Sequence, residues 1–199
     1  DLREQIAPLH ELIEAMAIPL IVVPDVEADD VIGTYARIAS EAGHDVLVST
    51  GDKDMAQLVT EKVHLINTMN QSRLDEAGVM EKFQVRPDQI IDYLALMGDK
   101  VDNIPGVPKV GPKTAAKWLT TYETLDNLIE NAADIGGKVG ESLREHLDQL
   151  PLSRQLTVIK CDVDVPEIEQ LKPGKADPAE LIPLLQELEF KTWLAEVQG

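Results

Sequence analysis

Seven acidic side chains fall into three short groups along the sequence, and carboxylates grouped in this way could bind metal ions. In chain order the groups are Glu27, Asp29 and Asp30; Asp52 and Asp54; and Asp99 and Asp102. The first two groups each follow a short apolar run that predicts a buried β-strand. Ligands of open parallel sheets bind beyond the carboxyl ends of the strands, so we expect these carboxylates to meet in one crevice.

Carboxylates crowded into one crevice repel one another, and such a cluster persists when cations neutralise it. Oxygen ligands select hard divalent cations, and no cysteine, and no histidine at ligand spacing, lies nearby to favour zinc. We therefore expect a pair of Mg²⁺ or Mn²⁺ ions that clamps the attacking and leaving oxygens of a phosphodiester. A simpler interpretation stays open, because acidic residues after strands often cap helices, and Asp25 and Asp54 could do only that.

The second feature that could bind a ligand is a segment rich in glycine and lysine, residues 103–117. It has the form of a helix-hairpin-helix, in which glycines allow a tight turn whose backbone approaches a phosphate. A helix that begins near Pro112 would present unpaired N–H groups to an anion. Four lysines against one aspartate give residues 100–117 a net charge of +3. This pattern predicts a grip on duplex backbone without reading of bases, and its alternative is an ordinary turn with solvated lysines. The residues expected to contact DNA are Lys100, Gly106, Lys109, Gly111, Lys113, Thr114 and Lys117.

The elements that must position these groups change character along the chain. The first part predicts an amphipathic helix over 2–17, with Ile6, Leu9, Ile13 and Met16 on one face, and then alternating strands and helices. Strands are expected at 19–23, 45–50 and 63–67, with one helix from about residue 25 to 42 and another after residues 51–54. Such alternation is typical of a parallel sheet with crossover helices.

Beyond residue 78 the sequence predicts helices and no further strand. The fold class is therefore α/β, with an α/β core over residues 1–98 followed by a helical part with the DNA-binding hairpin over residues 99–199. Residues 162–169 are expected to be extended. The predicted helices cover 77–83, 88–97, a segment after the hairpin, 124–133, 140–150, 151–160 and 178–197.

The composition argues against nucleic acid when it is taken alone. The net charge is −18, whereas proteins that bind phosphate backbones usually carry a basic face. No apolar run approaches the ~20 residues that span a bilayer. The first residues lack a secretory leader, and one cysteine, Cys161, leaves no internal disulfide. These features favour a cytoplasmic acidic protein, so the DNA interpretation depends on the order of the residues.

Four stretches of the sequence resemble the 5′-nuclease domain of bacterial DNA polymerase I, within the wider flap endonuclease family. They read VEADDVIG at 26–33, STGDKDMAQLV at 49–59, ALMGD at 95–99 and DNIPGV at 102–107. The motifs are long, and the resemblance runs in order along essentially the whole chain. It implies a PIN-like nuclease core and a structure-specific 5′-nuclease that cuts near the 5′ end of nicked, flapped or forked DNA. It also implies a role in DNA repair, replication and removal of RNA primers from RNA–DNA hybrids, with a polymerase portion covalently linked.

The resemblance also assigns roles to the groups above. The first acidic group resembles one metal site, the other two groups resemble residues that hold or approach a second, and residues 103–117 resemble the duplex-binding element with a K⁺ ion on hairpin carbonyls. The family's N-terminal strand–helix units, two further metal-site aspartates and a basic arch have no counterpart in the 199 residues. We therefore expect this chain to be an impaired fragment. Lys109 stands where the family more often has glycine.

Two other functions remain open from the sequence. A non-catalytic module that binds branched DNA would keep the hairpin and use the acidic groups only structurally. A small-nucleotide phosphatase on a similar sheet is disfavoured by the hairpin.

Overall fold

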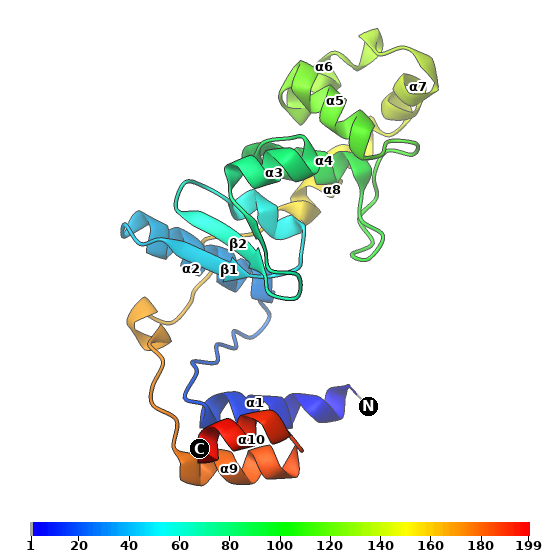
Figure 1. Ribbon diagram of the computed structural model, residues 1–199. Helices are drawn as coiled ribbons and strands as arrows, with labels where there is room; N and C mark the ends of the chain where they lie inside the picture. The colour runs from blue at the N-terminus through cyan, green and yellow to red at the C-terminus, as the bar shows by residue number, and fades with distance from the viewer. Residues whose placement is uncertain (1) are drawn as a thin grey trace. The chain divides into compact units, whose positions relative to one another are not determined.

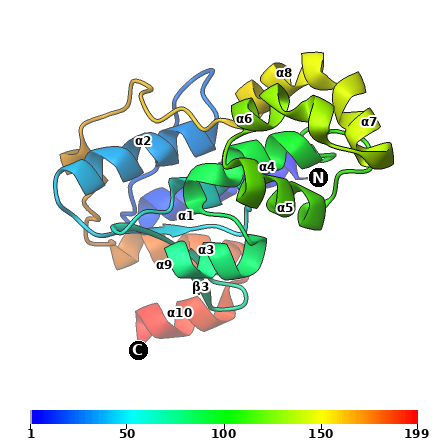
Figure 2. The same ribbon diagram turned by 90° about the horizontal axis from the view of Figure 1, so that it is seen from above.

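The computed structural model describes residues 2–199, which fall into two units (Figures 1 and 2). The first unit joins the residues up to Ala28 with those from Asp164 onward, and the second is Asp29–Val163. Each unit has its own hydrophobic core. Among the described residues, no helix is both long and apolar enough to cross a membrane.

The first unit consists of helices from both ends of the described chain. Helix α1 packs against α9, and α9 packs against α10 (Figure 1). Leu12, Leu181 and Leu185 form the centre of its small core. The helices are η1 (Arg3–Gln5), α1 (Ile6–Ala15), η6 (Ile168–Leu171), α9 (Pro178–Glu187) and α10 (Lys191–Gln198).

Three details of this unit differ from the sequence prediction. The helix over 2–17 buries Leu12, whereas Ile6 and Leu9 of the predicted apolar face are about half exposed at 48% and 54%. The single helix over 178–197 is two helices, because Glu189 between them has a positive φ of 58°. The strand over 19–23 is wrong: the segment is irregular, since no strand in the described residues pairs with it to satisfy its backbone N–H and C=O groups.

The second unit contains a sheet in the order β1-β2-β3. Its strands are β1 (Val46–Ser49), β2 (Val63–Asn67) and β3 (Ser72–Leu74). β1 and β2 are parallel, as predicted, and β2 and β3 are antiparallel, so the sheet is mixed. The sequence did not predict β3, which is short and mostly exposed and so has no apolar run to mark it. Helix α2 (Ala28–Glu41) precedes β1, and the 3₁₀ helix η2 (Asp54–Leu58) lies in the crossover to β2, both near their predicted places.

Helix α4 (Ile90–Met97) lies at the centre of the second unit, and it packs against α5, α8 and η2 (Figures 1 and 2). Its Ile90, Leu94 and Leu96 are at most 1% exposed. The predicted helices of this part are confirmed near their places, although α8 ends earlier than expected. The remaining elements are α3 (Glu76–Phe83), η3 (Pro87–Gln89), α5 (Pro112–Tyr122), α6 (Leu125–Glu130), η4 (Ala132–Asp134), α7 (Gly137–Glu145), η5 (Leu147–Gln149) and α8 (Leu150–Thr157).

After α8 the chain runs back to the start of the unit, and we call residues 157–163 the returning segment. The Lys160 N–H donates to Asp30 Oδ1 at 2.8 Å, and the Val163 N–H donates to Thr34 Oγ1 at 3.3 Å. Gln57 of η2 donates to the Thr157 carbonyl at 2.9 Å and accepts from the Ile159 N–H at 3.0 Å. These side chains take the place of helical partners, which explains why the helix predicted over 151–160 ends at Thr157.

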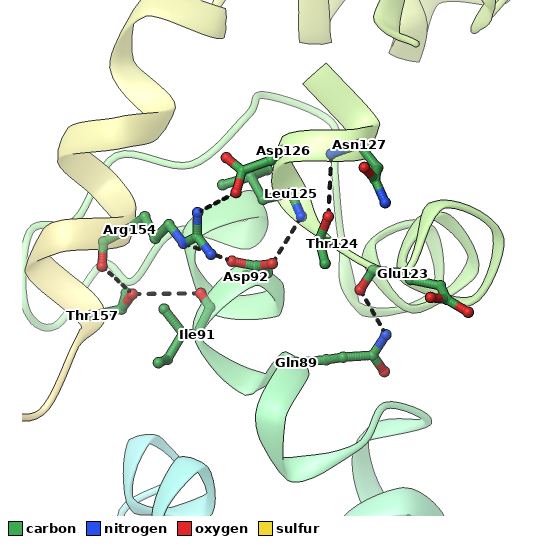
Figure 3. Close-up of polar contacts among 10 residues, drawn as sticks. All are labelled: Gln89, Ile91, Asp92, Glu123, Thr124, Leu125, Asp126, Asn127, Arg154 and Thr157. Carbon is green, nitrogen blue, oxygen red and sulfur yellow. Dashed lines mark hydrogen bonds and ion pairs between the residues drawn. The ribbon is translucent and has the colours of Figure 1, made fainter. Parts of the chain in front are cut away.

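A buried carboxylate joins three helices of the second unit (Figure 3). Asp92 of α4 is 5% exposed, and one of its oxygens accepts the Leu125 N–H at the start of α6, at 2.8 Å. Its other oxygen lies 3.0 Å from Arg154 Nε of α8, and Arg154 also reaches exposed Asp126 at 3.0 Å. Burial raises the pKa of Asp92, and the Leu125 N–H and Arg154 act against that shift.

We expect Arg154→Ala to lower the free energy of unfolding by about 3 kcal/mol, because it leaves the Asp92 carboxylate buried without a counter-charge. Asp126→Asn is the matched control, since an exposed ion pair contributes about 0–1 kcal/mol. Urea unfolding followed by circular dichroism at pH 7 measures both variants. Equal effects of the two substitutions would contradict this account of the network.

Candidate metal centre and nucleic-acid interface

Three of the predicted carboxylates lie together in the second unit. Asp54, Asp99 and Asp102 each offer an oxygen, and these atoms lie within 4.8 Å of one another. Asp54 opens η2 after β1, while Asp99 follows α4 and Asp102 lies in the next turn. Two segments that are distant in sequence thus supply one acidic cluster.

The electrostatics of Asp54 distinguish it from an ordinary helix cap. Burial, together with the negative charges of Asp52, Asp99 and Asp102, raises the pKa of Asp54 from 3.8 to about 6, with Lys53 opposing the shift. Its Oδ1 atom is buried without a hydrogen-bond partner. An unpartnered buried carboxylate oxygen is costly, and a bound cation would remove that cost. The residues present therefore fit a divalent metal ion.

Lys53 supplies a positive charge inside the same cluster. Its ammonium donates to Asp99 Oδ2, and this bond is the main reason that the pKa of Asp99 lies below its usual value. The other Asp99 oxygen accepts the Val101 N–H at 2.7 Å. Asp99 is 7% exposed, and these two hydrogen bonds hold its carboxylate in place. The sequence did not single out Lys53, although its place between Asp52 and Asp54 was visible.

The other four predicted ligands lie outside this cluster. Asp52 is exposed, and its Oδ1 accepts the Asp54 N–H at 3.0 Å, as a capping residue would. Asp30 is 8% exposed and holds the returning segment through the Lys160 N–H. Asp29 is half-buried in the first turn of α2, and Glu27 is exposed in the first unit. Their role as metal ligands stays a prediction.

The hairpin after α4 fixes the acidic cluster to the lysine-rich segment. Asp99 and Ile104 form an antiparallel bridge, with N–H to O distances of 3.0 and 2.7 Å. Gly98 has a φ of +70°, and a Cβ on it would lie 2.6 Å from the Ile104 carbonyl oxygen. A Cβ on Gly106 would collide with the backbone of Met97 and Gly98. Gly106 thus serves a close crossing of two backbone segments, and the approach of its backbone to a phosphate stays a prediction.

Three side chains from the following helices hold the carbonyl groups of the hairpin. Ser142 Oγ donates to the Pro108 carbonyl at 2.7 Å, Gln149 Nε2 donates to that of Gly106 at 2.9 Å, and Ser153 Oγ donates to that of Pro105. Ser142 and Ser153 are 4% and 0% exposed. Nothing in the sequence pattern marked these donors, because they lie more than 30 residues from their acceptors.

The first turn of α5 has the features of an anion-binding helix end. Gly111 precedes it without a side-chain cap, Pro112 is its first residue, and a Cβ on Gly111 would meet nothing within 4 Å. Lys113 and Lys117 stand one turn apart and are exposed, and Thr114 is half-buried. Lys100 and Lys109 of the hairpin are exposed as well. Open N–H groups beside several ammonium groups suit a phosphate backbone.

Comparison with known sequences decides which family has this arrangement. The family described as 5'-3' exonuclease, N-terminal resolvase-like domain, matches residues 1–84, and that described as 5'-3' exonuclease, C-terminal SAM fold, matches residues 85–179. The 5'-3' exonuclease of Aquifex aeolicus is 41% identical over 98% of this chain and 67% of its own length. The chain belongs to the 5'-3' exonuclease family.

Members of the 5'-3' exonuclease family also occur within larger proteins. DNA polymerase I of Pseudomonas aeruginosa is 51% identical over 99% of this chain, which covers 23% of that protein. DNA polymerase I of Rhizobium leguminosarum is 38% identical over 96% of the chain, which covers 19% of it. The chain thus spans about a fifth to a quarter of these polymerases and two-thirds of the Aquifex exonuclease.

Solved structures share the fold of this 5'-3' exonuclease chain. A T5 5'-exonuclease with bound divalent metal ions (zinc) has a TM-score of 0.66 at 19% identity, over 91% of this chain and 63% of that one. The catalytic core of Rad2 in complex with a DNA substrate has a TM-score of 0.61 at 15% identity, over 94% and 64% of the two chains. The α/β nuclease fold predicted from the sequence is confirmed, with a mixed rather than a purely parallel sheet.

Lys109 of this 5'-3' exonuclease chain has a φ of +71°, a backbone region that favours glycine. We expect Lys109→Gly to raise the free energy of unfolding by about 0.5–1 kcal/mol, since the left-handed conformation costs other residues about 1–2 kcal/mol. The matched control is Lys109→Ala, which also removes the charge but keeps a Cβ at positive φ, and so should not stabilise the fold. Thermal unfolding of both variants checks this, and equal stability of the two would show that the turn is unstrained.

Proposed function

We propose that the chain is the catalytic and DNA-binding part of a structure-specific 5′-nuclease, a metal-dependent 5′-3′ exonuclease and flap endonuclease. Its reaction would be hydrolysis of phosphodiester bonds near the 5′ end of nicked, flapped or forked DNA. The observation that carries the proposal is the unpartnered buried oxygen of Asp54 among the carboxylates of Asp99 and Asp102. Asp99 and Asp102 of this cluster lie on the same hairpin that leads to a helix end suited to a phosphate.

Mg²⁺ or Mn²⁺ is the proposed cofactor, because the donor set contains only oxygen atoms. Asp54, Asp99 and Asp102 would hold one ion, and the predicted ligands Asp29, Asp30 and Asp52 of the same unit would serve a second. When bound, such ions polarise the phosphate and lower the pKa of water. With its pKa raised to about 6, Asp54 is about half ionised at pH 6 in the absence of metal, and Lys53 would compete with a cation for Asp99.

The lysine-rich segment would supply the grip on duplex DNA. Lys113 and Lys117 contact backbone phosphates in this proposal, and the open N–H groups before Thr114 bind one of them. A K⁺ ion on the hairpin carbonyls is a secondary part of the proposal. Side chains already donate to three of these carbonyls, namely Ser142, Gln149 and Ser153. The proposed functional division, an α/β core over 1–98 and a DNA-binding part over 99–199, differs from the two structural units, since residues 164–199 belong to the first unit.

The wider setting of the proposal follows from the relatives. A polymerase portion would be covalently linked in the full protein, as the match to DNA polymerase I suggests. RNA primers in RNA–DNA hybrids would be substrates as well as DNA. The protein would act in DNA repair and replication in the cytoplasm.

Cleavage of a labelled 5′-flap duplex by this chain tests the proposal, with Mg²⁺ or Mn²⁺ in one series and a chelator in the other. The expected result is metal-dependent cutting that Asp54→Asn abolishes, slower with this impaired fragment than with a longer chain. A version extended at the N-terminus runs beside it, and cutting by that version alone would mean that part of the site lies outside this chain.

The second candidate, a non-catalytic module that binds branched DNA, is favoured by the backbone partners of Asp30 and Asp52 and by the Lys53–Asp99 pair. These contacts would hold the acidic residues in place without metal. If neither version cuts and both bind flapped duplex, this candidate replaces the nuclease.

A further inference from the structure

A small polar pocket is lined by residues that follow β1, by residues of β2, β3 and the turn that joins them, and by Lys82 of α3. Its volume is about 40 Å³, whereas a water site needs about 10–15 Å³. The pocket therefore has room for more than a single water and is of the size of a small tetrahedral ion. Its polar lining is Thr50, Asp52, Asn67, Asn70, Ser72 and Lys82.

Hydrogen bonds to the backbone orient the two amide side chains of the pocket. Asn67 Oδ1 accepts the Met69 N–H, and Asn70 Oδ1 accepts the Ser72 N–H, each at 3.0 Å. Only the oxygen of an amide can accept, so the NH₂ group of each side chain is turned away from its own turn. A Cβ on Gly51 would lie 3.3 Å from Asn67 Nδ2, which places this NH₂ group against the glycine that lines the pocket.

The remaining polar groups of the pocket are also mostly donors. Thr50 Oγ1 already accepts the Asp52 N–H at 3.0 Å, which leaves its O–H to donate. Ser72 and Lys82 also line the pocket, and the Lys82 ammonium lies 5.1 Å from the centre of the Phe83 ring. Asp52 is the one carboxylate of the lining, and its Oδ1 is bound to the Asp54 N–H.

Apart from the Asp52 carboxylate, the polar lining consists of two amides, two hydroxyls and a lysine, and these groups suit a ligand that carries negative charge and only accepts hydrogen bonds. We propose that this pocket binds a phosphate group of the DNA strand that is cut at the acidic cluster. The residues 50–54 join the two places, because Asp52 lines the pocket and binds the backbone of Asp54. The inference rests on the proposed nuclease function and adds a second contact for the strand.

Asn67→Asp is the sharpest variant for this pocket. It keeps the oxygen that accepts the Met69 N–H and replaces the NH₂ group by a negative oxygen. We expect flap-DNA binding by the full chain to weaken by about tenfold, the effect of losing a hydrogen bond to a charged group. KM should rise while kcat stays nearly unchanged, since the contact binds substrate equally before and during the reaction. A purely structural role of Asn67 would lower the melting temperature without this split.

Lys82→Met is the second variant, and it should weaken binding about threefold or more and reduce the salt dependence by about one phosphate contact. Gln155→Glu on α8 is the matched control, because it adds the same charge as Asn67→Asp at an exposed position far along the chain. This control should change DNA binding less than about twofold.

Titration with inorganic phosphate separates the two sources of a phosphate group. Nuclear magnetic resonance of the Asn67 and Asn70 side-chain NH₂ groups is the readout, with chloride at equal ionic strength as the blank. Shifts with both phosphate and flap DNA are expected. Shifts with phosphate alone would make this a site for the free ion and overturn the DNA contact, and no shift with either would overturn the pocket.

Flap cleavage by the unaltered chain is measured alongside, so that the two proposals fail separately. If that chain cuts flaps and Asn67→Asp cuts with the same KM, the pocket inference fails and the nuclease stands. If the chain neither binds nor cuts flapped DNA, the proposed function fails and the strand contact fails with it.

Discussion

Asp54→Asn is expected to lower the affinity of the chain for Mn²⁺ by at least about 100-fold, because outer-shell partners of metals already contribute about 10–100-fold. The substitution keeps the shape of the side chain and removes the charge of the carboxylate whose Oδ1 has no partner. Flap cleavage, wherever the unaltered protein shows it, should fall by a similar or larger factor. Calorimetric titration with Mn²⁺ measures the first effect independently of any cutting.

Asp52→Asn is the matched control for this experiment. An asparagine at 52 still offers Oδ1 to the Asp54 N–H, and Asp52 lies outside the group of Asp54, Asp99 and Asp102. The affinity for the first Mn²⁺ should therefore change much less than with Asp54→Asn. If the two substitutions weaken Mn²⁺ binding equally, the structural cluster is not the metal centre.

The same Asp54→Asn substitution should change the pH dependence of stability without metal. The pKa of Asp54 is raised from 3.8 to about 6, so the folded chain binds this proton more tightly than the unfolded chain. Stability contributed by the protonated form is therefore lost as the pH rises from about 4 to about 6. At pH 7.5 the asparagine variant should be more stable by about 1 kcal/mol, and at pH 4 the two proteins should be alike. Thermal unfolding in chelator at both pH values checks the sign.

The second large effect concerns Gly106. Gly106→Ala should lower the free energy of unfolding by about 3 kcal/mol or more, because the new methyl group meets the rigid backbone of Met97 and Gly98. The strands of the hairpin must separate to admit it, which displaces Asp99. We therefore expect Mn²⁺ affinity and duplex binding to fall together.

Gly111→Ala is the control for Gly106→Ala within the same segment. A Cβ at 111 meets nothing within 4 Å, and the φ of −116° suits any residue. This variant should fold like the unaltered chain, with stability within about 0.5 kcal/mol. Equal destabilisation by both alanines would mean that the crossing of the two backbone segments is looser than described.

The elements that the sequence predicted correctly carry their signal within a few neighbouring residues. Helix α2 has acidic residues at its start and Gly43 with φ +91° just after its end, and β1 and β2 are apolar runs between turns. The segment 19–23 has the same local signal as these strands. It forms no strand because a strand depends on a neighbour to pair with, and local composition does not report the neighbour.

The candidate site shows the same division between local and distant information. The sequence singled out Asp54, Asp99 and Asp102 by type, and it gave no means of separating them from Asp30 and Asp52. That separation depends on which carboxylate oxygens the fold brings within 4.8 Å of one another, as it does for Asp54 and Asp99 from two distant segments. Asp30 instead accepts the Lys160 N–H of the returning segment. The position of Lys109 is a partial exception, because the resemblance pointed to glycine where the structure has a positive φ.

The returning segment sets an order on folding during synthesis. The hydrogen-bond partner of Asp30, the Lys160 N–H, lies 130 residues later in the chain. The partners of Gln57, Thr157 and Ile159, lie about 100 residues later. Contacts of such separation form slowly, because the intervening chain must first be ordered or closed into a loop. While a ribosome is still making α8, the helix that carries Asp29 and Asp30 lacks its last partner. The unit Asp29–Val163 of a nascent chain should therefore stay sensitive to proteases until residue 163 has emerged from the ribosome, and this unit should then become resistant in a single step.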